Sequence, residues 1–166
     1  MKYISDYNST ELKNKLNDLI KLRSEDKFSS HFQNVISNRT NTISGKIKEK
    51  NFVIWHYKYF WSGMFYSVID GKISDNGETY FIELRTKLNS FGFILISIIS
   101  CVLGKVILTG IVLQENNSFK FVVLRLLVGI VLFLLFQSVP LLTYRSSKKE
   151  TVEMLTKKLK LRKNVC

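Results

Sequence analysis

The residue types that most often carry out catalysis are sparse in this chain of 166 residues. Its two histidines, His31 and His56, fall in separate predicted elements, and neither stands in a metal-ligand spacing such as HExxH. Cys101 lies inside an apolar segment and Cys166 is at the end of the sequence, so no disulfide framework is expected. The motifs GxSxG, GxGxxG and the P-loop are absent. We therefore expect no enzyme, no metal and no cofactor.

The remaining chemically capable groups are carboxylates near a predicted hairpin: Asp70, Asp75, Glu78 and Glu83. Acidic residues are common at turns and on the solvent side of strands, so we interpret these four as turn and surface groups. No small-molecule substrate is indicated. The sequence is more informative about the elements that would position a binding surface.

Apolar residues make up 46% of the chain and are concentrated in residues 91–142. Phe91 to Leu113 contains one charge, Lys105, and its helix would span about 34 Å, enough for a hydrocarbon core of about 30 Å. Phe121 to Leu142 is interrupted only by Arg125. The short link from Gln114 to Lys120 predicts that the two helices run antiparallel. Residues 91–142 are thus expected to form a transmembrane hairpin.

Lysine and arginine positions predict the orientation of this hairpin. Residues 1–90 carry 14 basic and 10 acidic groups, and residues 143–166 carry eight basic groups against two acidic ones. The only charged residues of the turn are Glu115 and Lys120. Because basic loops stay on the cytoplasmic side, both termini are predicted to be cytoplasmic in the inner (plasma) membrane. The overall charge of +12 is then a consequence of topology, which disfavours nucleic acid as a partner.

The two charges inside the apolar segments, Lys105 and Arg125, both fall in the half of the bilayer near the turn. They could mark an ion or proton path. They could also extend, or snorkel, towards the outer headgroups. We favour snorkelling, because neither residue reaches the midplane and no acidic partner lies inside the segments.

Small residues indicate where the membrane helices could pack. Ser100 and Gly104 form a small-xxx-small spacing, and Gly129 could act in the same way on the second helix. This pattern supports hairpin closure and self-association equally well.

Residues 1–40 are predicted to be helical. In residues 9–23, Leu12, Leu16 and Leu19 share one face, and Ser9 or Thr10 is a plausible N-cap. A second, shorter helix is expected from Asp26 to Ile36.

Residues 41–88 are rich in Ile, Val, Phe, Tyr and Trp and predict an antiparallel β domain. Four alternating runs fit a meander, with Asn76-Gly77 as a hairpin turn. The helix at residues 9–23 would cover its core. The aromatic run of Trp55, Tyr57, Tyr59 and Trp61 could line a binding site, lie in the core, or form an interfacial belt. We select these four as candidate partner-binding residues.

Residues 143–166 are predicted to form a basic cytoplasmic tail helix. Ser147 and Glu150 match a capping box, and Leu155 and Leu159 lie on one face. The helix could lie on anionic lipid or pack on the β domain.

The order of these parts resembles a group of small bacterial membrane proteins with two GxI hairpins before two membrane helices. The matching residues are Gly45, Ile47, Phe52, Ile54, Gly71, Ile73 and Glu150. This resemblance implies the architecture only, because the group has no established activity.

The expected fold is therefore an α+β membrane protein: an N-terminal helical segment, an antiparallel β-meander, a transmembrane hairpin and a basic C-terminal helix. The leading functional hypothesis is a non-catalytic inner-membrane protein whose cytoplasmic β domain binds a protein partner or lipid headgroups, with self-association also open. One alternative is an immunity or defence accessory protein acting against a membrane-active toxin. Another is a channel or transporter subunit using Lys105 and Arg125.

Overall fold

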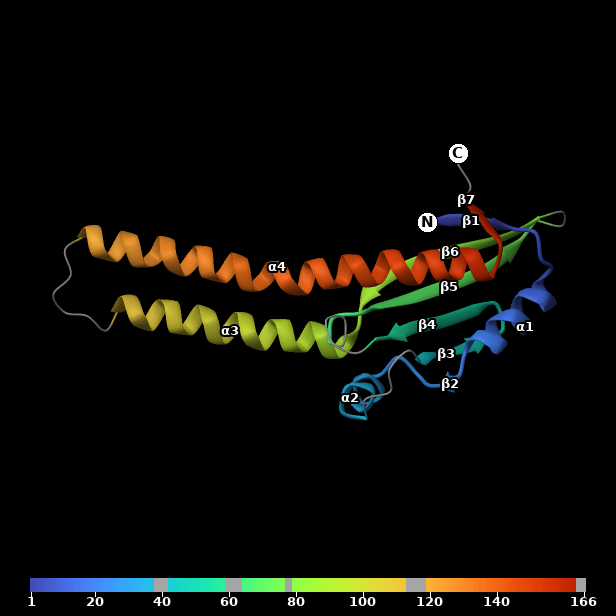
Figure 1. The fold of residues 1–166 in the computed structure, drawn as a ribbon, viewed down its shortest axis with the longest axis horizontal. Helices are drawn as coiled ribbons and strands as arrows, with labels where there is room; N and C mark the ends of the chain where they lie inside the picture. Colours follow the sequence, from blue (N-terminus) through green and yellow to red (C-terminus); the bar gives the residue numbers. More distant parts are fainter. Residues whose placement is uncertain (38–41, 59–63, 77–78, 113–118, 164–166) are drawn as a thin grey trace.

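The computed structural model describes residues 1–37, 42–58, 64–76, 79–112 and 119–163. Their backbone forms a mixed α/β fold in which four helices surround and extend from one sheet (Figure 1). The elements in chain order are β1 (Lys2–Ser5), α1 (Ser9–Leu19), β2 (Leu22–Arg23), α2 (Phe28–Ile36), β3 (Thr42–Lys48), β4 (Asn51–Tyr57), β5 (Ser67–Asp75), β6 (Tyr80–Leu88), α3 (Ser90–Val112), α4 (Phe119–Lys158) and β7 (Leu161–Lys163).

The sheet has seven strands in the order β2-β3-β4-β5-β6-β1-β7. Strands β3 to β6 form the expected antiparallel meander. The sequence did not predict the other three strands. Strand β1 pairs antiparallel with β6 and β7 pairs antiparallel with β1, so the two ends of the chain lie side by side, while β2 pairs parallel with β3. These three strands are too short for alternation to reveal them.

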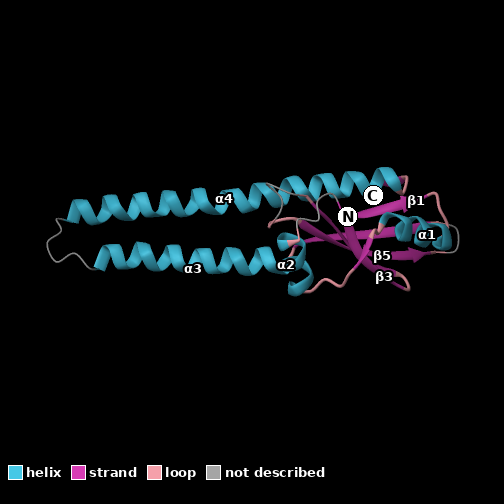
Figure 2. Cartoon of the chain, turned by 60° about the horizontal axis from the view of Figure 1, so that its bottom comes forward, coloured by secondary structure: helices cyan, strands magenta, loops and turns pink. Residues whose placement is uncertain are grey.

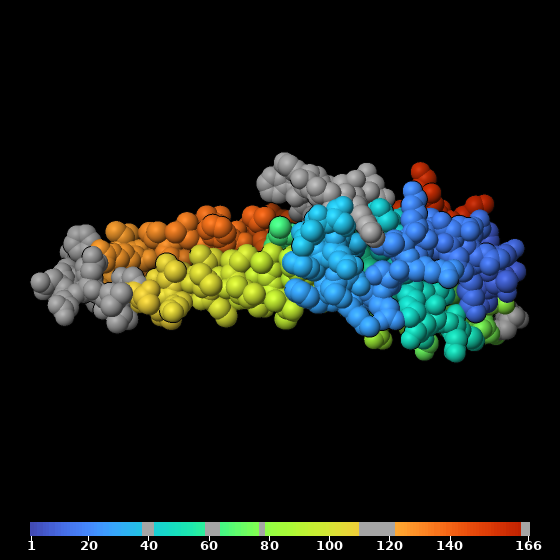
Figure 3. Space-filling model, turned by 90° about the horizontal axis from the view of Figure 1, so that it is seen from below, coloured from blue at the N-terminus to red at the C-terminus, as the bar shows by residue number. Residues whose placement is uncertain are grey.

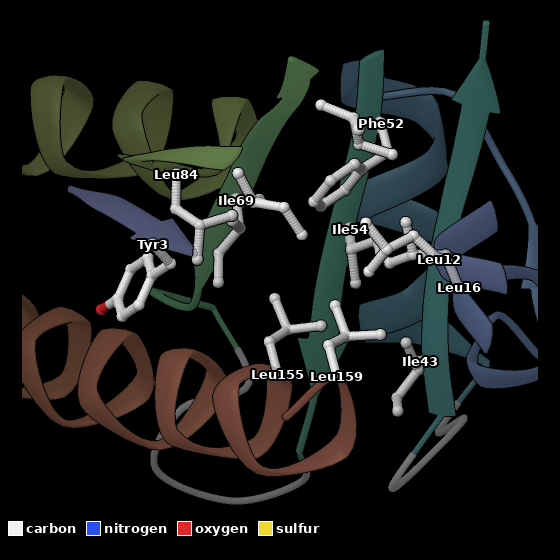
Figure 4. Close-up of a cluster of buried hydrophobic side chains, with 12 residues drawn as sticks. Tyr3, Leu12, Leu16, Ile43, Phe52, Ile54, Ile69, Leu84, Leu155 and Leu159 are labelled. Atoms are coloured by element: carbon white, nitrogen blue, oxygen red, sulfur yellow. The ribbon is translucent and has the colours of Figure 1, made fainter. Parts of the chain in front are cut away.

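One face of the sheet carries the main hydrophobic core, because α1 and the C-terminal part of α4 pack on it. Figure 4 shows Leu12 and Leu16 of α1, and Leu155 and Leu159 of α4, around the apolar side chains of the strands. All four leucines are fully buried. Close packing leaves no spare volume at Gly71, where an added Cβ would lie 2.0 Å from Cζ of Phe52. Only glycine fits opposite that ring.

Helix α1 begins at Ser9, where the predicted helix begins, but it ends at Leu19 and not at residue 23. Asn8, not Ser9 or Thr10, is the N-cap: its side chain accepts a hydrogen bond from the backbone N–H of Glu11 at 2.9 Å. The Glu11 carboxylate in turn accepts from the N–H of Asn8 at 3.2 Å, completing a capping box.

The tail helix predicted at Ser147 is not a separate element. Helix α4 runs for 40 residues and continues through Pro140, so Ser147 lies within it and is not an N-cap. Its buried hydroxyl accepts a hydrogen bond from the backbone N–H of Ser67 at 3.1 Å, and Glu150 pairs with Lys58. The interpretation as a capping box was wrong. A Ser-x-x-Glu sequence can also lie in the middle of a helix, where here a backbone N–H of the sheet donates to the serine hydroxyl.

Helices α3 and α4 run antiparallel and project together from one end of the sheet domain (Figure 2). Both are long and apolar enough to cross a membrane. Only 6% of the most apolar window of each helix is buried, and exposed side chains such as Phe93 and Leu134 line them. Neither segment is therefore a core helix of this fold.

Candidate functional site

The predicted aromatic strand is largely enclosed. Trp55 and Tyr57 of β4 are 0% and 2% exposed and form a second cluster with Tyr66 and Val68. This cluster lies on the sheet face opposite the main core, beneath α2, because side chains on a strand alternate between faces. Among the three roles that the sequence left open for Trp55 and Tyr57, their buried position fits packing in a core. Tyr59 and Trp61 lie outside the described residues.

Helix α2 places His31 at the centre of this cluster. The ring is fully buried and lies 4.9 Å from the Trp55 ring, centroid to centroid. Its Nδ1 meets the hydroxyl of Tyr66, and its Nε2 lies 2.6 Å from Oδ1 of Asp26. Tyr66 can donate to Nδ1, so that the Nε2–H donates to Asp26. Both ring nitrogens are thus satisfied inside the protein.

The network continues to the sheet surface. The Lys87 ammonium on β6 lies 2.6 Å from Oδ2 of Asp26 and 3.2 Å from Oδ2 of Asp70. The hydrogen bond from His31, with Lys87 nearby, lowers the pKa of the Asp26 carboxyl. Burial raises the pKa of the Tyr66 phenol, which therefore stays protonated. We call these five residues the α2 network.

An Asp–His–Tyr arrangement is chemically capable of moving a proton, but this one is closed. His31 and Tyr66 are both 0% exposed, so no substrate atom can reach either group in this conformation. Within the described part of the chain, no group of three or more His, Cys, Asp or Glu side chains is placed to hold a metal ion. The arrangement instead ties α2 to strands β5 and β6.

From the sequence, His31 was considered only as a candidate metal ligand or catalytic residue, and this network was missed. Its members lie far apart in the chain, so spacing alone does not connect them. Within α2, His31 lies three residues after Phe28, about 60° from it around the helix, so the helical pattern did not single out the histidine side as the one that packs on the protein.

The sheet face that carries the Trp55 cluster is polar and largely basic where α2 does not cover it. Cross-strand register places Lys46, Asp70 and Arg85 in one row with Val53, and Lys72, Glu83 and Lys2 in another. Lys46 pairs with Glu25 at 2.5 Å. Lys72 and Arg85 are exposed and form no ion pair with another described residue. We call this surface the basic sheet face.

An open groove of about 360 Å³ runs between α1 and the β2–β3 edge of the sheet. Its charged lining is mixed: Lys13, Arg23 and Lys46 lie beside Glu25 and Glu49. A lining with charges of both signs does not indicate whether a ligand would be positively or negatively charged.

The predicted packing residues of the apolar helices occupy different positions. Ser100 accepts a hydrogen bond from the side-chain amide of Gln137, which links α3 to α4. An added Cβ at Gly129 would lie 3.0 Å from Ile107, so Gly129 is at the contact between the helices. Gly104 has no atom within 4 Å of such a Cβ and lies away from that contact.

Lys105 and Arg125 are both exposed on the apolar helices. Arg125 lines an open hollow of about 370 Å³ between α3 and α4, together with Ile107 and Gly129, whereas Lys105 is not part of its lining. Neither residue forms an ion pair with another described residue. Their roles as snorkelling charges or path-lining groups stay predictions.

No protein-family model, curated protein or solved structure matches this chain.

Proposed function

We propose that this chain is a non-catalytic, two-span protein of the bacterial inner membrane with both termini in the cytoplasm. Its sheet domain stands at the membrane surface, and the basic sheet face binds a protein partner through an acidic surface of that partner. Helices α3 and α4 provide the anchor.

The continuity of α4 is the observation that carries this proposal. The apolar half of α4 exposes side chains such as Leu134 and Leu135, which are 61% and 59% accessible. The other half of the same helix buries Leu155 and Leu159 completely in the sheet domain. A single unbroken helix joining an exposed apolar rod to a packed core holds the domain at a fixed place beside the bilayer.

The direction of the strands favours a protein partner over lipid headgroups for the basic sheet face. The long strands β4, β5 and β6 run roughly along the same direction as α3 and α4 (Figure 1). With those helices across a bilayer, the sheet stands upright from it, and its faces look sideways into the cytoplasm. A flat lipid surface would meet only the end of the sheet.

The charges on this face suit an acidic partner. Lys72 and Arg85 are exposed without ion-pair partners in the described part of the chain, so a partner's carboxylates could pair with them directly. Electrostatic complementarity of this kind steers association and weakens as salt screens the charges.

Comparative affinity capture from membranes solubilised in a mild detergent tests this proposal. The bait carries Lys72→Gln and Arg85→Gln, and the matched control carries Lys157→Gln and Lys158→Gln on the exposed side of α4, with the same loss of charge. We expect a partner that binds wild type and control equally, is released by added salt, and is lost from the Lys72→Gln/Arg85→Gln bait. A partner set identical for all three baits would contradict the role of the basic sheet face.

A further inference from the structure

Helix α2 packs Val35 against the Trp55 cluster but leaves its large apolar side chains outside, while two of its polar side chains are buried. Its polar residues His31 and Asn34 are 0% and 4% exposed. Its large apolar residues Phe28, Phe32 and Ile36 are 43%, 42% and 66% exposed. They follow one another every fourth position, so they share one face. In water a helix of a soluble domain buries its apolar stripe and exposes its polar side.

The outer face of α2 lies at the level where the apolar helix α3 begins. The rings of Phe28 and Phe32 lie 5.5 and 5.8 Å, centroid to centroid, from the ring of Phe91, the second residue of α3. Figure 3 shows α2 packed against the sheet-domain end of α3. From Phe91 onward, α3 exposes apolar side chains, including Phe93 and Ile94. The apolar surface of α2 is therefore continuous with that of the hairpin.

The direction of α2 also fits a surface position. Its axis runs across α3 and α4, in contrast to α4, which continues along the hairpin (Figures 1 and 2). With α3 and α4 across a bilayer, a helix that crosses them at the start of α3 lies in the plane of the membrane surface. This is the position and direction of an interfacial amphipathic helix.

We propose that α2 is such a helix, lying in the cytoplasmic leaflet with Phe28, Phe32 and Ile36 in the boundary between headgroups and acyl chains. This inference rests on the proposed membrane anchoring through α3 and α4. The occupant is lipid because the exposed face continues into the lipid-facing surface of α3. Phenylalanine is among the residues found on the apolar face of interfacial amphipathic helices.

The α2 network fixes how α2 is rotated about its own axis. His31 is held from two directions, by Tyr66 and by Asp26, which itself contacts Lys87 of β6. Rotation of the helix that would hide Phe28 and Phe32 would break both contacts of His31. The sheet domain is thus attached to the bilayer at two places, through α4 and through α2, which limits its tilt about the hairpin.

Nitroxide accessibility in vesicles of phosphatidylcholine and phosphatidylglycerol tests the inference. A spin label is attached at Phe32→Cys or Ile36→Cys in the full chain, with Cys101→Ser and Cys166→Ser to remove the native thiols. Reference sites are Phe93→Cys on α3 and Lys72→Cys on the basic sheet face. Molecular oxygen concentrates in the bilayer and a nickel chelate in water, so the ratio of their collision rates reports the surroundings of each label.

We expect the labels at Phe32→Cys and Ile36→Cys to give oxygen-to-chelate ratios close to that of Phe93→Cys and several-fold above that of Lys72→Cys. A ratio like that of Lys72→Cys, with Phe93→Cys still in lipid, overturns the role of α2 and leaves the two-span anchor intact. Labels on α2 that are immobile and closed to both agents also overturn it, because α2 would then be covered by protein. A water-like ratio at Phe93→Cys instead contradicts the proposed anchoring itself.

Discussion

Helices α1 and α2 are short neighbours in one domain and bury opposite kinds of side chain. Helix α1 turns Leu12 and Leu16 inward, both fully buried, and leaves its charged residues to the solvent. Helix α2 turns His31 inward and leaves Phe28 and Phe32 partly exposed. The difference teaches that an amphipathic pattern identifies two faces but does not say which one meets the protein. The medium outside each helix decides that, and α2 lies at the end of the sheet domain from which the apolar hairpin emerges.

The largest difference between the two helices is expected in the stability lost when one apolar side chain of each is replaced by alanine. Leu16→Ala removes a fully buried side chain from the main core and should destabilise the domain by about 2–5 kcal/mol. Phe32→Ala should cost much less in detergent, because that ring is 42% exposed and touches only Phe28 and Phe91 among the described rings. Denaturant titration followed by near-ultraviolet circular dichroism measures both. Equal losses would contradict the assignment of α2 to an apolar medium.

The sheet beneath α1 and α4 should tolerate no added volume. Gly71→Ala would push a methyl group to 2.0 Å from Phe52, which is itself 1% exposed, and we expect a loss of about 1–3 kcal/mol. Gly104→Ala on α3 is the matched control, because nothing lies within 4 Å of its added Cβ. The same titration compares the two variants. A Gly71→Ala protein as stable as the control would mean that this core is not closely packed.

The polar contact between His31 and Tyr66 should contribute less to stability, and substitutions of the two residues should be energetically coupled. His31→Phe keeps a ring in the cluster but leaves the buried Tyr66 hydroxyl without its histidine partner, for an expected cost of about 1–3 kcal/mol. Tyr66→Phe should then cost less in the His31→Phe background than in the wild type, because the hydrogen bond between the two side chains is already lost. A double-mutant cycle measures this interaction. Strictly additive losses would show that the two side chains do not support each other.

The smallest expected effect is a pH dependence of the α2 contact. The pKa of Asp26 is lowered in the folded protein, from an ordinary value of 3.8, first by the hydrogen bond from His31 and then by Lys87. The folded state therefore favours the carboxylate, and this stabilisation is complete above 3.8 and is lost as the pH falls through the lower folded value. Trp55 fluorescence, next to His31, should report loosening of α2 at acid pH in the wild type. Asp26→Asn should remove that part of the acid response; an identical response would exclude Asp26 as its source.

Patterns within single segments were sufficient for several elements. The apolar runs around residues 91–142 predicted α3 and the first half of α4, because an apolar stretch of that length with a single charge is recognisable whatever surrounds it. Alternation with period two predicted the meander β3–β6, and a period near 3.6 predicted α1. In each case the information lies within a few neighbouring residues.

The candidate sites were predicted less well, since they depend on contacts between distant residues. Sequence alone left Trp55 and Tyr57 open to three roles, and only the packing of α2 over β4 placed them in a core. His31, Asp26 and Lys87 gained a role only when β6 and α2 came together. The spacing of these residues in the sequence does not indicate how close they lie in the folded protein.

By itself the sequence determined that this protein has two apolar helices, a meander and short amphipathic helices, because local periodicity fixes the secondary structure of strongly patterned segments. Tertiary structure alone decided that α4 continues past Ser147 into the core, that β1 and β7 join the chain's two ends in one sheet, and that α2 turns its aromatic face outward. The physical reason is that a helix boundary, a short edge strand and the rotation of a helix depend on partners far away in the chain. Those partners supply the hydrogen bonds and buried contacts that local patterns leave undecided.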